Sequence, residues 1–309
     1  MARVFVTRKL PGGAVDRLAA EHDVDVWPEP EPPPRAELLE RARDAEGLLA
    51  LLTDRIDDEL LERASGLRAV ANYAVGTDNV DLEAATGRGV PVGNTPDVLT
   101  ETTADLAFAL MLAAARRIVE AEAAVRAGEW PEWQPDAFLG HDVHGATLGI
   151  VGYGRIGRAV ARRAEGFGMT VLHGIPLHEL LARSDFVSVH APLTPDTRGM
   201  IGSEELAAMK PTAILVNTAR GPLVDTQALE HALRKGQIAA AALDVTDPEP
   251  LPADHPLLTA PNLVVVPHIG SASHSTREAM AGMAVDNLLA ALRGERMPHC
   301  ANPEVYERR

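Results

Sequence analysis

Cysteine is nearly absent from the sequence, because Cys300 is the only one among 309 residues. A single cysteine excludes an intramolecular disulfide and any zinc site built from several thiolates. It lies near the C-terminus without the histidine and asparagine context of a nucleophile. The chain also lacks any spacing of ligating residues typical of a metal site, so we expect no bound metal.

Basic residues and long apolar runs are also scarce. The chain has 29 Lys and Arg against 44 Asp and Glu, a formal net charge of −15. This balance argues against non-specific binding to nucleic acid or to an anionic membrane. No run reaches the roughly 18 consecutive apolar residues of a membrane span, and the N-terminus does not resemble a secretory signal. We therefore expect a cytoplasmic protein with neither nucleic acid nor membrane as a partner.

The apolar residues that are present, 46 % of the chain, form short runs that alternate with amphipathic stretches. In the N-terminal part this pattern predicts five strands separated by four helices. Such alternation indicates parallel pairing and an α/β layer. The expected strands are 3–7, 24–27, 47–52, 67–72 and 90–93, and the expected helices are 14–21, 35–43, 57–64 and 82–87.

A long helix is expected from 100 to 127, followed by an irregular stretch, 128–144, that carries Trp130 and Trp133. A second run of strands and helices then begins. Six strands are enough for one complete doubly wound sheet. They are expected at 147–151, 170–172, 186–190, 213–217, 239–244 and 263–266, with helices near 155–166, 176–182, 203–208, 226–235 and 275–293.

A glycine-rich turn follows the first strand of this second run. Gly152, Gly154 and Gly157 form G-x-G-x-x-G between an apolar strand and a helix. The first glycine permits a tight turn, the second lets the backbone approach a pyrophosphate, and the third lets helix and strand pack closely. The free N–H groups of the helix would face the phosphates. The context favours a dinucleotide site over a glycine-rich turn that binds nothing.

Polar residues follow three successive strands near the end of this second run. They bring Arg220, Glu249 and His268 to the ends of the strands at 213–217, 239–244 and 263–266. Ligands of an open parallel sheet bind beyond the carboxyl ends of its strands. One such end would mean little, but three that supply an arginine, a glutamate and a histidine predict a catalytic group.

The motifs G-x-G-x-x-G, N-T-A-R-G, D-V-x-x-x-E-P and P-H-I-G, in this order and at these separations, resemble those of the D-isomer-specific 2-hydroxyacid dehydrogenases. The resemblance covers essentially the whole chain, including the stretch 74–81. Within the family the chain is most similar to glyoxylate/hydroxypyruvate reductases. The resemblance implies a Rossmann-type doubly wound domain and a smaller, flavodoxin-like α/β substrate domain. The expected boundaries are 1–97 plus 287–309 for the substrate domain and 98–286 for the dinucleotide domain.

The resemblance also implies the catalytic roles. Arg220 would hold the carboxylate and carbonyl of a 2-keto acid, because a guanidinium donates a planar fork of hydrogen bonds. His268 would be the general acid and base, since an unperturbed imidazole has a pKa of about 6.5. Glu249 would orient the ring and favour the imidazolium. The backbone N–H groups of Val75 and Gly76 would clamp the substrate carboxylate.

Further positions carry over as cofactor or substrate contacts. Trp133 resembles the tryptophan that reaches into a partner subunit's substrate pocket in glyoxylate reductases, and plain interface packing is the alternative. The expected cofactor contacts comprise the pyrophosphate turn, the adenosine side and the nicotinamide side. These are Gly152, Gly154, Arg155, Ile156 and Gly157; His190, Pro192 and Thr197; and Thr103, Thr218, Ala219, Asp244 and Gly270.

The stretch after the second strand departs from the family pattern. His173 to Pro176 runs almost at once into the next helix, where family members have a longer loop. That loop carries an acid for the ribose hydroxyls of NAD, or basic and hydroxyl residues for the NADP phosphate. Here His173 is the only polar side chain, so the choice between NAD and NADP stays open. The lack of a repelling acid slightly favours NADP.

The sequence therefore predicts an NAD(P)H-dependent enzyme that reduces glyoxylate or hydroxypyruvate to the D-2-hydroxy acid. The long helix and the tryptophan segment suggest a homodimer. One alternative is a dehydrogenase of D-3-phosphoglycerate or of another D-2-hydroxy acid. The other is a nucleotide-sensing binding protein, like the transcriptional co-repressors of the same fold.

Overall fold

The computed structural model describes residues 1–307, which form two compact units. Within these residues, unit 1 comprises 1–99 and 272–307, and unit 2 comprises 100–271. The chain thus returns to unit 1 at residue 272, whereas the sequence places this boundary at 287. The reason is that α11 (His274–Leu292) is one continuous helix that packs on α1 (Ala14–Ala19) and on three strands of unit 1.

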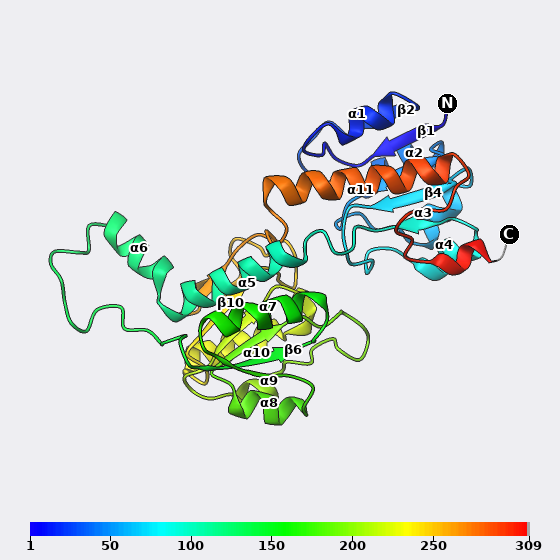
Figure 1. Ribbon diagram of the computed structural model, residues 1–309. Helices are drawn as coiled ribbons and strands as arrows, with labels where there is room; N and C mark the ends of the chain where they lie inside the picture. Colours follow the sequence, from blue (N-terminus) through cyan, green and yellow to red (C-terminus); the bar gives the residue numbers. More distant parts are fainter. Residues whose placement is uncertain (308–309) are drawn as a thin grey trace. The chain divides into compact units, whose positions relative to one another are not determined.

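Unit 1 contains a five-stranded parallel sheet with helices on both faces (Figure 1). Its order, β2-β1-β3-β4-β5, is the flavodoxin-like order predicted from the resemblance. α11 and α1 cover one face, and α2, α3 and α4 cover the other. The strands are β1 (Arg3–Val6), β2 (Asp23–Val26), β3 (Gly47–Ala50), β4 (Ala69–Asn72) and β5 (Val92–Gly93); the helices on the second face are α2 (Arg35–Arg43), α3 (Asp58–Arg63) and α4 (Leu82–Gly87), and η3 (Pro303–Tyr306) follows near the C-terminus.

Unit 2 contains a six-stranded sheet in the order β11-β10-β9-β8-β6-β7, all parallel. The number of strands agrees with the sequence prediction. α5 and α7 pack on one face, and α8, α9 and α10 pack on the other (Figure 1). The strands are β6 (Thr147–Val151), β7 (Thr170–Leu172), β8 (Phe186–Val189), β9 (Ile214–Asn217), β10 (Ala240–Leu243) and β11 (Leu263–Val265); the helices are α5 (Thr100–Ala115), α6 (Ile118–Arg126), α7 (Arg155–Gly166), α8 (Leu177–Arg183), α9 (Ser203–Ala208) and α10 (Thr226–Lys235), with η1 (Gly221–Leu223) and η2 (Pro256–Thr259).

On the β7 side, this sheet has one strand fewer than the usual dinucleotide fold. In the order 3-2-1-4-5-6 a third strand lies outside the second. Here β7 is the edge strand, and β8, the next strand along the chain, pairs with the opposite side of β6. Only residues 173–176 separate β7 from α8, which leaves no room for an outer strand.

The strands of unit 2 form where the sequence has short apolar runs. All four residues of β8, β9 and β10 are buried, as expected for strands covered on both faces.

Side chains also fix several helix starts, because a cap satisfies N–H groups that have no partner within the helix. The Asp225 carboxylate accepts hydrogen bonds from the N–H groups of Gln227 and Ala228 at the start of α10.

The single helix expected at 100–127 is wrong, because the chain breaks at Arg117 between α5 and α6. Arg117 has a left-handed backbone, with φ of 52°. The Ala115 carbonyl accepts a hydrogen bond from the N–H of His141 at 2.8 Å, so it does not continue the α5 helix. Gly140 packs so closely here that a Cβ would lie 2.1 Å from this oxygen. A tertiary contact therefore ends the helix.

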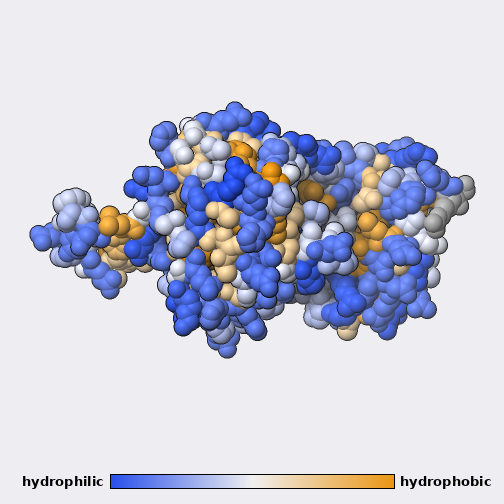
Figure 2. Space-filling model, turned by 90° about the horizontal axis from the view of Figure 1, so that it is seen from below, coloured by the Kyte–Doolittle hydropathy of each residue, from blue (hydrophilic) through white to orange (hydrophobic). Residues whose placement is uncertain are grey.

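Residues 118–139, which we call the arm, leave unit 2 at this break and return at Gly140. The arm consists of α6 and an irregular stretch, and it projects at the left of Figure 1. Part of the projecting segment appears hydrophobic in Figure 2, and the arm carries exposed large apolar side chains. They are Ile118, Val119, Val125, Trp130, Trp133, Phe138 and Leu139.

Within residues 1–307, no helix is long and apolar enough to span a lipid bilayer. The same part of the chain contains no group of three or more His, Cys, Asp or Glu side chains that could hold a metal ion.

Candidate functional site

Arg220, Glu249 and His268 all follow the carboxyl ends of neighbouring strands in the unit 2 sheet. β9, β10 and β11 are neighbours in the sheet and run in parallel, with Asn217 beside Leu243 and Leu243 beside Val265. The segments that leave their carboxyl ends are therefore adjacent. A Cβ on Gly221 would lie 1.9 Å from the Thr246 carbonyl oxygen, so the first two segments pack directly on each other.

His268 and Glu249 form a close pair. The Nδ1 atom of His268 lies 2.6 Å from Oε1 of Glu249, and both side chains are partly exposed. The other carboxylate oxygen, Oε2, accepts a longer hydrogen bond from the N–H of Thr246. A carboxylate on one ring nitrogen fixes the orientation of the imidazole and leaves the second nitrogen to exchange a proton. The geometry is that of an oriented general acid and base.

The backbone at His268 is held in an unusual conformation. Its φ of 52° lies in the left-handed region, which is uncommon for residues other than glycine. The N–H of His268 donates to the carbonyl of Asp244, and the next two N–H groups, of Ile269 and Gly270, donate to the Asp244 carboxylate. Asp244 therefore holds the backbone of β10 and the segment after β11 together.

Burial raises the pKa of the Asp244 carboxyl, although the two backbone N–H groups and the nearby His268 act in the opposite direction. Asp244 is almost completely buried, with both oxygens engaged. Thr103 lies against the same corner, because its hydroxyl donates to the Gly270 carbonyl at 3.1 Å. Three residues expected on the nicotinamide side, Thr103, Asp244 and Gly270, are thus brought together.

Arg220 follows β9 with a well-anchored backbone. The Asn217 side chain donates to the carbonyl of Arg220, and the Arg220 guanidinium donates to the carbonyl of Ala219 at 2.8 Å. The neighbouring Thr218 is buried, and its hydroxyl has no hydrogen-bond partner within residues 1–307. A buried polar atom without a partner is costly, and a ligand group would satisfy it.

The glycine-rich turn has the geometry that a pyrophosphate needs. Gly152 has a φ of 95°, and a Cβ there would lie 2.4 Å from the backbone nitrogen of Ala191. A Cβ on Gly157 would lie 2.3 Å from the Gly152 carbonyl oxygen, so α7 packs directly on the turn. At Gly154 no atom of the described chain would lie within 4 Å of a Cβ. Arg155 and Ile156 begin α7, whose first turn contains no acidic residue.

A dinucleotide fits these residues on the pyrophosphate and nicotinamide sides. On the adenosine side, His190 is held by Ser188, whose hydroxyl lies 2.8 Å from Nε2. Burial lowers the pKa of His190 to about 4, so its ring is neutral near pH 7. The Thr197 hydroxyl donates to the Pro192 carbonyl at 2.7 Å and shapes the loop after β8.

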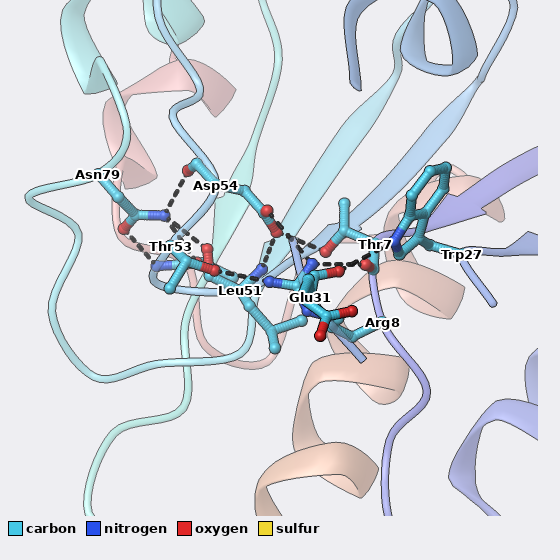
Figure 3. A network of polar contacts seen from close by, with 9 residues as sticks. Thr7, Arg8, Trp27, Glu31, Leu51, Thr53, Asp54 and Asn79 are labelled. Carbon is cyan, nitrogen blue, oxygen red and sulfur yellow. Dashed lines mark hydrogen bonds and ion pairs between the residues drawn. The ribbon is translucent and has the colours of Figure 1, made fainter. Parts of the chain in front are cut away.

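In unit 1, a network of buried polar groups holds the loop that contains Val75 and Gly76. The Asn72 side chain donates to the Gly76 carbonyl at 2.9 Å and to Asn79. Asn79 in turn donates to the carbonyls of Leu51 and Asp54 (Figure 3).

The Asp54 carboxylate accepts hydrogen bonds from Thr7 and from the N–H of Leu51. Burial raises the pKa of the Asp54 carboxyl, while its hydrogen bonds act against this increase. Arg8 completes the network through Thr53 (Figure 3). The sequence prediction missed these residues, although they follow β1, β3 and β4 just as Arg220, Glu249 and His268 follow strands of unit 2.

Within the described chain, Trp133 takes part in none of the hydrogen-bond networks described above. Trp133 is 78 % exposed on the arm, and no hydrogen bond or ring contact within residues 1–307 fixes its side chain. At the root of the arm, the Arg117 guanidinium lies 5.6 Å from the centre of the Phe138 ring.

Taken by its own geometry, the chain is an α/β protein with a dinucleotide-type glycine-rich turn and an oriented acid–base pair. Residues 108–270 match the family model described as the NAD binding domain of D-isomer specific 2-hydroxyacid dehydrogenases. The chain is 52 % identical to a glyoxylate reductase of Korarchaeum cryptofilum, over 99 % of this chain and 97 % of that protein. The chain belongs to the family of D-isomer-specific 2-hydroxyacid dehydrogenases.

Solved structures agree with this assignment. A protein from Thermus thermophilus is 53 % identical, with a TM-score of 0.92 over 97 % of this chain and 99 % of that one. An NADPH-dependent glyoxylate/hydroxypyruvate reductase from Sinorhizobium meliloti, solved with NADP and malonate, is 34 % identical, with a TM-score of 0.86 over 98 % and 97 %.

The alignment with the Korarchaeum protein has 322 positions, more than the 309 residues of this chain. At least 13 of those positions are therefore gaps in this chain. The short connection between β7 and α8, residues 173–176, is consistent with gaps at this place in the alignment.

Proposed function

We propose that this protein reduces glyoxylate or hydroxypyruvate to the corresponding D-2-hydroxy acid with a reduced nicotinamide dinucleotide. The observation that carries the proposal is the 2.6 Å contact between His268 and Glu249 at neighbouring strand ends. It is supported by the glyoxylate reductases to which the chain is about half identical over nearly its whole length.

The chemistry divides between cofactor and protein. A bound reduced dinucleotide supplies a hydride to the carbonyl carbon of the keto acid. The carbonyl electron pair moves onto oxygen, and His268 donates a proton from Nε2 to that oxygen. Glu249 holds Nδ1 and stabilises the protonated ring before the transfer. In the oxidative direction His268 accepts the proton.

Binding groups surround this step in the proposal. The Arg220 guanidinium binds the carboxylate and carbonyl of the substrate, and the N–H groups of Val75 and Gly76 bind its carboxylate. Thr218, Ala219, Asp244, Gly270 and Thr103 hold the nicotinamide. Gly152, Gly154, Arg155, Ile156 and Gly157 hold the pyrophosphate, and His190, Pro192 and Thr197 lie on the adenosine side.

We propose NADPH as the preferred reductant, with NADH as the alternative. No Asp or Glu lies between Met169 and His178, so nothing in this stretch repels a 2′-phosphate or accepts the ribose hydroxyls. A cytoplasmic location stays a prediction from the sequence.

We also propose a homodimer formed through the arm. Exposed apolar side chains of this size are unusual on a monomer and typical of an interface. Trp133 either enters the substrate site of the partner subunit or packs in the interface.

A turnover assay tests the proposed reaction. Purified protein is mixed with glyoxylate or hydroxypyruvate, and the loss of reduced nicotinamide absorbance is followed with NADPH and, separately, with NADH. We expect turnover with both substrates and faster turnover with NADPH. Dinucleotide binding without turnover would contradict the reaction and would favour a nucleotide-sensing protein.

A further inference from the structure

The end of β7 is the place where a doubly wound fold recognises the ribose next to adenine. A residue about 20 positions after the glycine-rich turn accepts hydrogen bonds from the ribose hydroxyls when it is acidic, and a basic residue nearby accommodates a 2′-phosphate. In this chain β7 ends at Leu172, and His173 follows directly. His173 therefore occupies the position from which the fold distinguishes the two dinucleotides.

The ring of His173 is held against the glycine-rich turn. Its centre lies 3.5 Å from that of the Tyr153 ring, and the two planes differ by 3°. Tyr153 stands between Gly152 and Gly154, so the stack joins the end of β7 to the turn that would hold the pyrophosphate. The imidazole is thus oriented although it is exposed, and either protonation state keeps at least one N–H donor.

The charge of this region suits an anion, although the protein as a whole is acidic. From Gly152 to Pro176 the chain has four arginines and one histidine but a single carboxylate, Glu165. Two of the arginines, Arg162 and Arg163, are paired with acidic residues of α5. Arg155 and Arg158 lie in the first turn and a half of α7, the end at which a helix favours negative charge.

We propose that the stacked Tyr153–His173 pair recognises the 2′-phosphate of NADPH, with the imidazole of His173 donating a hydrogen bond to it. This inference rests on the dinucleotide site of the proposed function and names the residues that select the cofactor. The short connection at 173–176 makes the pair decisive, because it removes the loop that would otherwise supply the contact.

Equilibrium binding of NADPH and NADH, measured by calorimetry without any keto acid, tests the pair. We expect the unchanged protein to bind NADPH about tenfold more tightly, as one charge-assisted hydrogen bond implies. His173→Ala should abolish this difference by weakening NADPH alone. His173→Asp should reverse it, because a carboxylate repels the phosphate and accepts from the ribose hydroxyls. The retained affinity for NADH shows that each variant is folded.

His178→Ala is the matched control, since His178 is an exposed histidine in the first turn of α8 and should leave both affinities unchanged. Equal affinities in the unchanged protein, or equal weakening of both by His173→Ala, would overturn the inference. Failure to bind either dinucleotide would overturn the proposed function as well. A protein that binds both but reduces no keto acid contradicts only the reaction, because the ratio of the two affinities still decides the role of His173.

Discussion

His268 is the residue on which the proposed chemistry depends most. Without its proton the alkoxide formed by hydride addition is not neutralised, so His268→Gln should lower kcat by about 10²- to 10⁴-fold, the usual contribution of a general acid. Dinucleotide affinity should not change. Steady-state kinetics and calorimetry measure the two quantities. His231→Gln, an exposed histidine on α10, is the control and should behave as the unchanged protein. Loss of less than about tenfold in kcat would contradict the assignment.

The buried ring of His190 leads to a prediction about stability rather than turnover. Burial lowers its folded-state pKa to about 4, below the unfolded value of about 6.5. The folded state therefore resists protonation, and its stability is lost as pH falls from about 6.5 towards 4. Chemical unfolding at several pH values should show this decrease, up to about 3 kcal/mol from this group. His190→Asn should unfold with a weaker pH dependence over this range, and an unchanged dependence would contradict the account.

The hydrogen-bond network of unit 1 acts at the scale of secondary-structure elements. Asn79 joins the segments after β3 and β4, so Asn79→Ala leaves the Leu51 and Asp54 carbonyls without these donors. We expect a loss of about 1–3 kcal/mol in the stability of unit 1. Amide hydrogen exchange should show faster exchange in β3 and β4. The strands of unit 2 serve as the internal reference, and equal acceleration there would contradict a local role.

The exposed apolar side chains of the arm lead to a prediction about the oligomeric state. Leu139 is 68 % exposed on the arm, and a charge there would be buried in the proposed interface. Leu139→Arg should therefore convert the dimer to a monomer, as measured by light scattering. Leu258→Arg is the control, because Leu258 is also exposed but lies in η2. A monomeric unchanged protein, or a dimer that survives Leu139→Arg, would contradict the proposal.

The elements show which features local sequence can predict. Runs such as Ile214–Asn217 and helices such as α2 were predicted within a few residues, because the periodicity of apolar residues is local. The break at Arg117 was not, because it depends on the contact between His141 and Ala115. The stack of Tyr153 on His173 was missed for the same reason. The polar network of unit 1 could have been predicted by examining the strand ends of that sheet.

At the scale of the whole molecule, the sequence predicted two parallel α/β sheets and the family, and both are confirmed. The edge position of β7 could have been predicted from the sequence, because the short connection at residues 173–176 leaves no room for an outer strand. The pairing of His268 with Glu249 agrees with the geometry expected from the strand ends. The roles of these residues in catalysis stay predictions.

Transfer of a labelled hydride tests the central claim most directly. NADPH that carries deuterium at the transferable position of the nicotinamide is incubated with the protein and glyoxylate, and the glycolate is examined by mass spectrometry. In ordinary water, the account predicts one deuterium bound to carbon in each glycolate formed. In a parallel reaction with unlabelled NADPH in deuterated solvent, it predicts no deuterium at that carbon. Glycolate that takes this hydrogen from solvent, or no glycolate at all, would contradict it.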